Sequence, residues 1–326
     1  MRELPYAAEV PASAVHISTG QDMNKTTRSR AAYEWPTLSL IVQCYTAFAV
    51  AVLLLPQLGL WLAIPVLILS IALHSSLQHE TVHGHPLPQR WLAVALVWLP
   101  MGLLVPYERF RDQHLAHHLD TRLTDPYDDP ETGYFDPQIW QQLSPWLQVL
   151  LRFNNSLAGR LTVGPAISQY AFIWGDYRLW KNGQRDLAWV WARHCLGVAV
   201  ILTVVAQFGT IPLWAYLLSA YFGMSTLKIR TFLEHRTHQH AGGRTVIVED
   251  AGLLSLLFLN NNYHAVHHAQ PGVAWYDLPR TFAEKRAHYL AKNQGYYYKN
   301  YGEIFRTFCF HPKEPVPHPL MDKDAK

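Results

Sequence analysis

Apolar residues are concentrated in four long stretches, which form two pairs along the chain. The members of the first pair are separated by the short turn 56–59, and those of the second pair by Gly209 and Thr210. A helix needs about 20 apolar residues to cross about 30 Å of hydrocarbon, and each stretch comes close to that length. The pattern therefore predicts two transmembrane helical hairpins, with spans at about 37–55, 60–77, 187–208 and 211–229.

Basic residues are distributed unevenly around these stretches. Both turns lack Lys and Arg, whereas the N-terminal, middle and C-terminal segments contain nearly all of them. Because cytoplasmic loops of membrane proteins are enriched in Lys and Arg, both termini and the middle segment are predicted to be cytoplasmic. Arg193 and His194 lie inside the third stretch, and we expect them near its cytoplasmic end, where long side chains reach the headgroups.

Two shorter apolar segments are not expected to cross the membrane. Segment 91–105 is broken by Pro100 and Gly102 and is predicted to be an interfacial or re-entrant helix, while 253–259 is too short to span. The predicted organisation is a cytoplasmic arm at 1–36, a membrane domain at 37–310 and a C-terminal tail at 311–326.

The composition agrees with contact to a membrane. Half of the 326 residues are hydrophobic and only 16% are charged, against about 25% in ordinary soluble domains. The 12 Trp and 17 Tyr suit the bilayer interface. A soluble helical protein is the alternative, but matched hairpins with uncharged turns disfavour it. The basic residues form no stripe, which argues against nucleic-acid binding, and three distant cysteines argue against disulfide or thiolate sites.

The 18 histidines are the most informative residues. Three strings contain most of the relevant ones: HETVH at 79–83, HLAHH at 114–118 and HAVHH at 264–268, and Glu234–His235 forms a fourth cluster. Positions i, i+3 and i+4 share one face of a helix, so the imidazoles of each string can converge. Neutral imidazole binds iron, zinc, copper or nickel. Eight or nine imidazoles exceed the needs of one ion, so the pattern predicts a site for two.

Two further interpretations use the same residues. The first string also reads HExxH, in which Glu80 would be the general base of an intramembrane zinc protease. Such a protease would leave two HxxHH strings unexplained. A metal transporter would place its ligands near the bilayer midplane, whereas these clusters lie at the ends of the predicted spans.

The set HETVH, HLAHH and HAVHH, in this order around two hydrophobic hairpins, resembles the membrane fatty-acid-desaturase superfamily. That superfamily includes acyl desaturases, acyl hydroxylases, carotenoid ketolases and, more distantly, alkane hydroxylases. The resemblance runs from about Thr37 to Pro279 and is far more specific for the superfamily than for a substrate. It implies nine metal ligands: His79, His83, His114, His117, His118, His235, His264, His267 and His268.

The resemblance also points to residues outside the ligand set. Asp125, before Pro126, has a spacing seen in relatives and could orient a ligand through its second ring nitrogen, or could simply begin a turn. Asn261 and Asn262 could hold a metal-bound water. Glu234 is expected in the same outer layer as Asp125 and Asn262.

The implied protein is an all-α integral membrane enzyme whose cytosolic helical cap holds two iron ions and uses O2 to oxidise an unactivated C–H bond. Desaturation of an acyl chain of a lipid is the first expectation, and hydroxylation stays open because both reactions use the same ligands. The HGH and FLEHR segments also resemble members that act on small amino-acid-derived metabolites, such as a dihydrorhizobitoxine-type desaturase. Carotenoid oxidation is a further alternative.

The electron donor is expected to be a separate protein. The sequence contains no cytochrome b5 domain, no Cys-rich ferredoxin pattern and no dinucleotide fingerprint. We therefore expect a ferredoxin or a cytochrome b5-like carrier, with its reductase, to deliver two electrons per turnover. The expected location is the inner (cytoplasmic) membrane, with the active site on the cytoplasmic side.

Overall fold

The computed structural model describes residues 33–118 and 122–321, so most of the predicted N-terminal arm lies outside the described residues. The described part is mostly helical, as predicted. It also contains one pair of short parallel strands, in which Ile247 lies opposite Tyr297 and Val248 opposite Tyr298. The elements are α1 (Trp35–Leu53), η2 (Leu55–Gln57), α2 (Leu60–Val82), α3 (Arg90–Val97), α4 (Tyr107–His117), α5 (Pro137–Gln142), α6 (Pro145–Asn154), α7 (Leu157–Thr162), α8 (Gly164–Lys181), α9 (Leu187–Phe208), α10 (Leu213–Thr231), η4 (Ala241–Arg244), β1 (Ile247–Val248), α11 (Leu253–Leu257), α12 (His264–Ala269), η5 (Trp275–Asp277), α13 (Leu278–Glu284), α14 (Arg286–Lys292), β2 (Tyr297–Tyr298) and α15 (Tyr301–Phe308).

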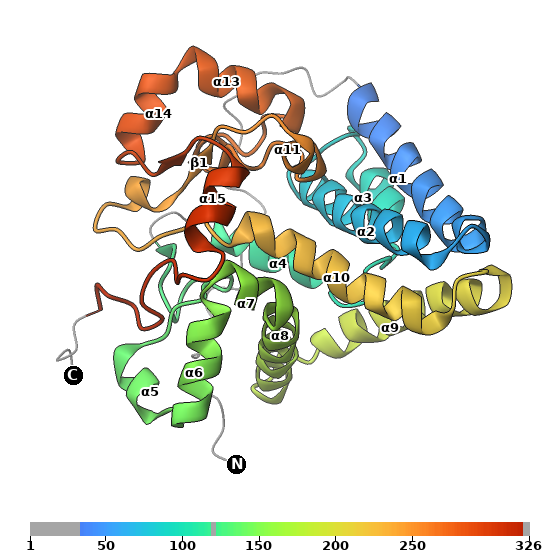
Figure 1. Cartoon of the computed structure of the whole chain (residues 1–326), viewed down its shortest axis with the longest axis horizontal. Helices are drawn as coiled ribbons and strands as arrows, with labels where there is room; N and C mark the ends of the chain where they lie inside the picture. Colours follow the sequence, from blue (N-terminus) through green and yellow to red (C-terminus); the bar gives the residue numbers. More distant parts are fainter. Residues whose placement is uncertain (1–32, 119–121, 322–326) are drawn as a thin grey trace.

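The long apolar helices gather on one side of the molecule (Figure 1). Among the described residues, three are long and apolar enough to cross a membrane: α1 with η2, α2, and α9. The fourth predicted span is also a helix, α10, but Lys228 and Arg230 lie in its last turn and it does not meet the same requirement. A membrane crossing by α10 therefore stays a prediction.

Helix α2 is the centre of this group and packs along both α1 and α10. Close approach of α10 depends on Gly223, because a Cβ at that position would lie 2.6 Å from Ile71 Cγ2. Small residues at such contacts are typical of helices that pack tightly in membranes. The same contact holds the end of α2 beside the end of α10, which brings two of the histidine-bearing segments together.

The predicted interfacial segment 91–105 contains the short helix α3 and an irregular stretch before α4. Its backbone reverses at Leu103, which has φ 64°. Side chains of the long helices satisfy its carbonyl groups: Tyr216 Oη donates to the Met101 oxygen (2.7 Å), and His194 Nε2 lies 2.9 Å from the Leu103 oxygen. Irregular backbone beside membrane helices needs such partners, because lipid offers none.

A buried ion pair attaches α4 to α8. Arg109 donates from Nε and a terminal nitrogen to Asp176, at 2.7–3.0 Å, and Trp191 of α9 donates to the same carboxylate (2.8 Å). Both charged side chains are largely buried. Helix α4 carries three of the predicted ligands at its end, so this pair helps to set where they lie.

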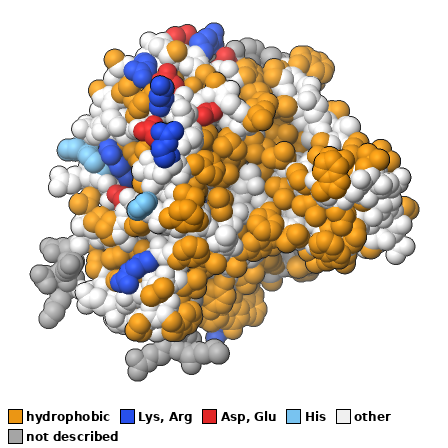
Figure 2. Space-filling view, in the orientation of Figure 1, with side chains coloured by type: hydrophobic (Ala, Val, Ile, Leu, Met, Phe, Trp, Pro, Cys, Tyr) orange, Lys and Arg blue, Asp and Glu red, His pale blue; other side chains and the backbone are white. Residues whose placement is uncertain are grey.

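The surface is divided into two regions. Apolar side chains cover the part formed by the long helices, and charged side chains gather over α13 and α14 (Figure 2). Large exposed aromatic residues mark both ends of the long helices. Trp61, Phe208 and Trp214 lie at one end, and Trp35, Trp91 and Trp189 lie toward the end that carries the histidines.

Candidate metal centre

Four separate segments bring nine histidines together. They are the last turn of α2, the end of α4, the loop after α10, and α12. Each HxxHH string is helical, so its three imidazoles share a face. The structure brings together every predicted ligand: His79 and His83; His114, His117 and His118; His235; His264, His267 and His268.

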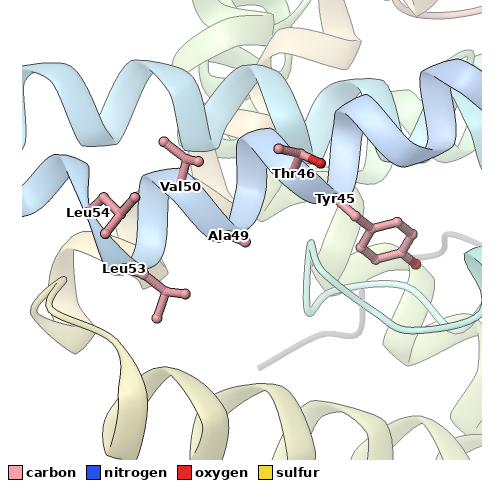
Figure 3. A pocket seen from close by; sticks show the side chains of 6 residues that line it. All are labelled: Tyr45, Thr46, Ala49, Val50, Leu53 and Leu54. Atoms are coloured by element: carbon pink, nitrogen blue, oxygen red, sulfur yellow. The ribbon is translucent and has the colours of Figure 1, made fainter.

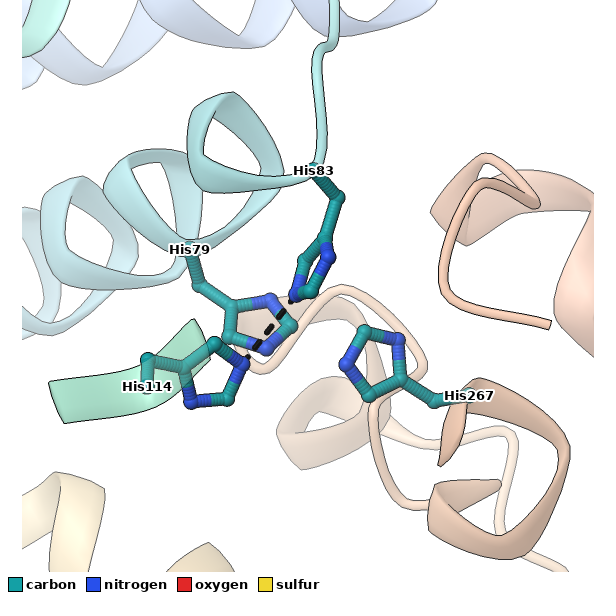
Figure 4. Close-up of side chains that lie close together, drawn as sticks. All are labelled: His79, His83, His114 and His267. Carbon is teal, nitrogen blue, oxygen red and sulfur yellow. Dashed lines mark hydrogen bonds between the residues drawn. The ribbon is translucent and has the colours of Figure 1, made fainter. Parts of the chain in front are cut away.

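Eight of these histidines form two clusters of four, in each of which the potential ligand atoms lie within 4.8 Å of one another. The first cluster, whose rings point toward a common centre in Figure 4, consists of His79, His83, His114 and His267. The second cluster consists of His117, His235, His264 and His268. The ninth residue, His118, adjoins the first cluster, since its Nε2 lies 3.0 Å from His114 Nε2 and 3.1 Å from His267 Nε2. The clusters are neighbours, with 5.8 Å between the ring centres of His264 and His267.

Hydrogen bonding in the second cluster leaves a place for a cation. His117 Nδ1 donates to Asp129 (2.8 Å) and His264 Nδ1 donates to Asn261 Oδ1 (3.2 Å). In the neutral rings both Nε2 atoms therefore present lone pairs. His235 Nε2 lies 2.8 Å from His117 Nε2 and 3.0 Å from His264 Nε2, but only one of these two contacts can be a hydrogen bond. A metal ion among the three nitrogens removes the remaining lone-pair repulsion, because neutral imidazoles donate to it.

The spacing of the ring nitrogens also fits metal coordination. Five Nε2 pairs within the centre are 2.8–3.1 Å apart. With a metal–nitrogen bond of about 2.1 Å, ligands at right angles are about 3.0 Å apart and tetrahedral ligands about 3.4 Å apart. These short separations are compatible with nitrogens that share one metal ion, and all ligand atoms of each cluster lie within 4.8 Å of one another.

Burial keeps most of these imidazoles neutral, which is the form that binds metal. Outside the long apolar helices, burial and then neighbouring histidines lower the pKa of five of them: His83, His118, His235, His264 and His267. His117 differs. Burial acts to lower its pKa, but Glu131 and Asp129 outweigh burial and raise the pKa to about 9. A metal ion must therefore displace a proton from His117 at neutral pH.

Two carboxylates that the sequence analysis did not single out contact the ligands. Asp129 accepts from His117 Nδ1 and from the backbone N–H of Thr124 (2.8 Å), a residue with the unusual φ of 70°. Glu131 Oε1 lies 3.1 Å from His114 Nδ1, and its Oε2 lies 3.9 Å from His117 Nε2, so it reaches toward both clusters. Such carboxylate–imidazole contacts orient a ligand and raise its basicity.

Asp125, expected to orient a ligand, lies elsewhere. Its Oδ1 accepts from the backbone N–H groups of Tyr127 (2.8 Å) and Asp128 (3.1 Å), and within the described residues no hydrogen bond joins it to the nine histidines. It therefore begins a turn, the second of its two predicted roles. An acidic run follows the second string, and the rule that ligating histidines pair with carboxylates could have drawn attention to it. The spacing alone could not select Asp129 and Glu131 from that run.

Glu234 and Asn262 were also predicted to lie around the ligands, and the structure places one of them, Glu234, near a ligand. Glu234 Oε1 lies 3.6 Å from His264 Nδ1 and forms an ion pair with Arg230 (2.9 Å). Asn262 instead donates to the Val248 carbonyl (2.7 Å). Its neighbour Asn261 is the amide at the centre, between His264 Nδ1 (3.2 Å) and His79 Nε2 (3.5 Å).

The HExxH reading is not supported by the surroundings of Glu80. A protease of that type needs this carboxylate beside a metal-bound water. Here Glu80 is buried and accepts from the backbone N–H of Trp275 (3.3 Å), in the segment after α12. The two histidines of HExxH instead share the first cluster with His114 and His267.

Comparison with known proteins agrees with this geometry. The Fatty acid desaturase family matches residues 56–301, a range that includes all nine histidines. The chain is also 24% identical over 235 residues to the "Beta-carotene ketolase" of Paracoccus sp. (strain N81106 / MBIC 01143), covering 69% of this chain and 76% of that protein. The resemblance predicted from the histidine strings is thereby confirmed, and the chain belongs to the fatty acid desaturase family.

Proposed function

We propose that the protein is an O2-dependent oxidoreductase that holds two iron ions and desaturates an acyl chain of a membrane lipid. The observation that carries this proposal is the pair of adjacent, almost entirely imidazole clusters, backed by two carboxylates. Imidazole with carboxylate support suits iron, and four imidazoles for each ion are fewer than the six ligands that iron can accept.

When bound, a reduced iron pair supplies the redox chemistry by which O2 is reduced and a C–H bond is oxidised. For desaturation, one –CH2–CH2– unit, O2, two electrons and two protons give –CH=CH– and two waters. The electrons come from the separate carrier, a ferredoxin or a cytochrome b5-like protein with its reductase.

The residues of the chain hold and orient the centre. Asp129 and Glu131 hold the rings of His117 and His114 by their Nδ1 atoms, which leaves both Nε2 lone pairs directed at the clusters. Six of the nine histidines are buried and the other three are partly buried, which limits the access of bulk water to the centre. Exclusion of water and a set position for one C–H bond are the main contributions a protein makes to such chemistry.

The placement of the centre at one end of the long helices supports a membrane-derived substrate. Trp61 and His79 are 18 residues apart on α2, which is about 27 Å at 1.5 Å per residue. Exposed aromatic residues such as Trp61 at one end and Trp189 at the opposite end are typical of the two membrane interfaces. In this arrangement α1–α2 and α9–α10 are two hairpins, and the remaining helices form a cap that holds the centre at the cytoplasmic interface.

An open pocket along α1 lies apart from the metal centre. Its lining is almost entirely apolar: Tyr45, Thr46, Ala49, Val50, Leu53 and Leu54 (Figure 3). None of the nine histidines lines it. The hydroxyl of Tyr45, one of the lining residues, donates to the Leu96 carbonyl (2.8 Å).

A second candidate reaction is oxidation of a carotenoid, which is suggested by the relative named beta-carotene ketolase. Carotenoids and acyl lipids both reach an enzyme through the membrane, so the placement of the centre does not separate them. Hydroxylation of an acyl chain, and desaturation of a small amino-acid-derived metabolite, would use the same pair of clusters.

Metal analysis of the protein purified in detergent tests the centre. We expect about two irons per chain, because each cluster offers about four ligand nitrogens. His267→Ala removes a ligand of the first cluster and His117→Ala one of the second, and each should lower the iron content sharply. One zinc per chain that ignores both substitutions and disappears with His79→Ala would overturn the proposal.

The reaction is tested with the iron-loaded enzyme, a reduced ferredoxin and isotopically labelled O2. An acyl lipid that loses two hydrogens without gaining labelled oxygen supports desaturation. Label in a lipid product means hydroxylation instead, and label in a carotenoid means ketolase-type oxidation.

A further inference from the structure

The C-terminal segment 309–318 lies beyond the part of the chain that matches the family, yet it packs against the metal centre. It contacts two loops near the second cluster. One is the loop after α10, which contains His235. The second follows Glu131 and contains Tyr134 and Phe135. The Phe135 N–H donates to the Val316 carbonyl (3.0 Å), and the His318 N–H donates to the Phe135 carbonyl (2.8 Å).

His235 depends on its backbone for its position. His117, His114 and His264 each have an Nδ1 held by a side chain, whereas the buried Nδ1 of His235 makes no hydrogen bond to any described residue. Its main chain is held instead. It forms a bridge with Thr245, and the ammonium group of Lys313 donates to its carbonyl oxygen.

The next residue of the segment connects both loops. Glu314 accepts from the backbone N–H (3.3 Å) and hydroxyl (2.8 Å) of Thr237, two residues after His235. It also accepts from the hydroxyl of Tyr134, three residues after Glu131. One carboxylate therefore joins the loop of His235 to the loop that carries the carboxylates oriented toward His117 and His114.

We propose that Lys313 and Glu314 are positioning residues of the second cluster: by holding the main chain of His235 and joining the two loops, they keep the second metal bound. This inference rests on the proposed two-metal centre. The first cluster takes no ligand from the loop of His235, so its metal should be independent of Lys313.

The test compares cobalt(II) binding by the metal-free forms of the full-length wild type, Lys313→Met, Lys313→Arg and Glu314→Gln. Cobalt(II) reports its ligands through its visible absorption and needs no O2 or substrate. Methionine keeps the length of the lysine stem but cannot donate to the His235 carbonyl, so we expect one of two cobalt ions to bind about 10- to 100-fold more weakly. Arginine keeps a donor and should restore binding, and Glu314→Gln, which keeps one acceptor oxygen, should give an intermediate loss.

The matched control is Lys285→Met, which removes an exposed lysine between α13 and α14 that forms no hydrogen bond or ion pair with the nine histidines among the described residues. It should bind two ions like the wild type. Weakened binding of both ions in Lys313→Met, or unchanged binding of both, would overturn the inference. A wild type that binds fewer than two ions would instead contradict the proposed centre itself, so the two failures are distinguishable.

Discussion

Replacing Asp129 by asparagine tests how strongly the outer carboxylates hold the second cluster. Asp129 accepts three N–H groups: His117 Nδ1 (2.8 Å), the Thr124 backbone (2.8 Å) and the Glu131 backbone (3.0 Å). The amide has the same shape but only one acceptor oxygen. In either orientation its NH2 group faces at least one of these donors, and it carries no charge to assist the bond from His117.

One buried donor without a partner costs about 1–3 kcal/mol. A factor of ten corresponds to about 1.4 kcal/mol, so the second metal should bind about 10- to 100-fold more weakly. The measurement is a cobalt(II) titration of the metal-free protein in competition with a chelator of known affinity. The first metal should be affected far less, since its cluster does not contain His117.

Asp125→Asn is the matched control, because it removes the same charge from the same loop. Among residues 33–118 and 122–321, the side chain of Asp125 accepts hydrogen bonds only from backbone groups of its own turn, so we expect both metals to bind as in the wild type. Equal losses in Asp125→Asn and Asp129→Asn would show that loop charge alone matters and would refute the reasoning. An affinity unchanged in Asp129→Asn would refute it as well.

Three further predictions concern pH and packing. Because the pKa of His117 is raised to about 9, the second metal must displace a proton to bind. The affinity of the second cluster should therefore rise about tenfold per pH unit from pH 7 to 9, while the affinity of the first cluster changes little. Metal titrations at three pH values measure both affinities, and an equal pH dependence of the two would contradict the prediction. Gly223→Ala should lower the free energy of unfolding in detergent by about 1–3 kcal/mol, since the new Cβ would lie 2.6 Å from Ile71 Cγ2. If this overlap is the cause, Gly223→Ala should cost less when it is introduced into the Ile71→Ala variant and compared with that variant alone. Arg109→Met leaves Asp176 buried without its ion partner and should cost about 3–5 kcal/mol in the same unfolding measurement; a loss below about 1 kcal/mol would show that the pair is not needed.

The histidine strings allowed most of the centre to be predicted, because helical periodicity is local. HLAHH and HAVHH place three imidazoles on one helical face whatever the rest of the chain does. The four long helices could be predicted equally well from the sequence, and α9 has the predicted bounds. Their ability to cross a membrane follows from length and apolar content for α1, α2 and α9, while Lys228 and Arg230 separate α10 from them.

The outer contacts could not be predicted in the same way, because they depend on the path of irregular loops. Asp125 and Asp129 are four residues apart in one acidic run, and only the turn at Thr124 decides which of them reaches His117. The choice between Asn261 and Asn262 likewise depends on the direction in which the chain turns before α12. Lys313 offered no pattern at all, since its partner is a main-chain oxygen.

The order of the ligand-bearing segments along the chain has a consequence for biosynthesis. Each cluster combines residues from the first 118 positions with residues from 264–268, so neither can be completed before the last of these leaves the ribosome. Until then a growing chain exposes six of the nine imidazoles, which copper or zinc would bind more tightly than iron, following the general order of metal affinities. The proposed two-iron centre therefore requires that metal loading follow synthesis of residues 264–268, with iron delivered to an apoprotein in which both clusters are already folded.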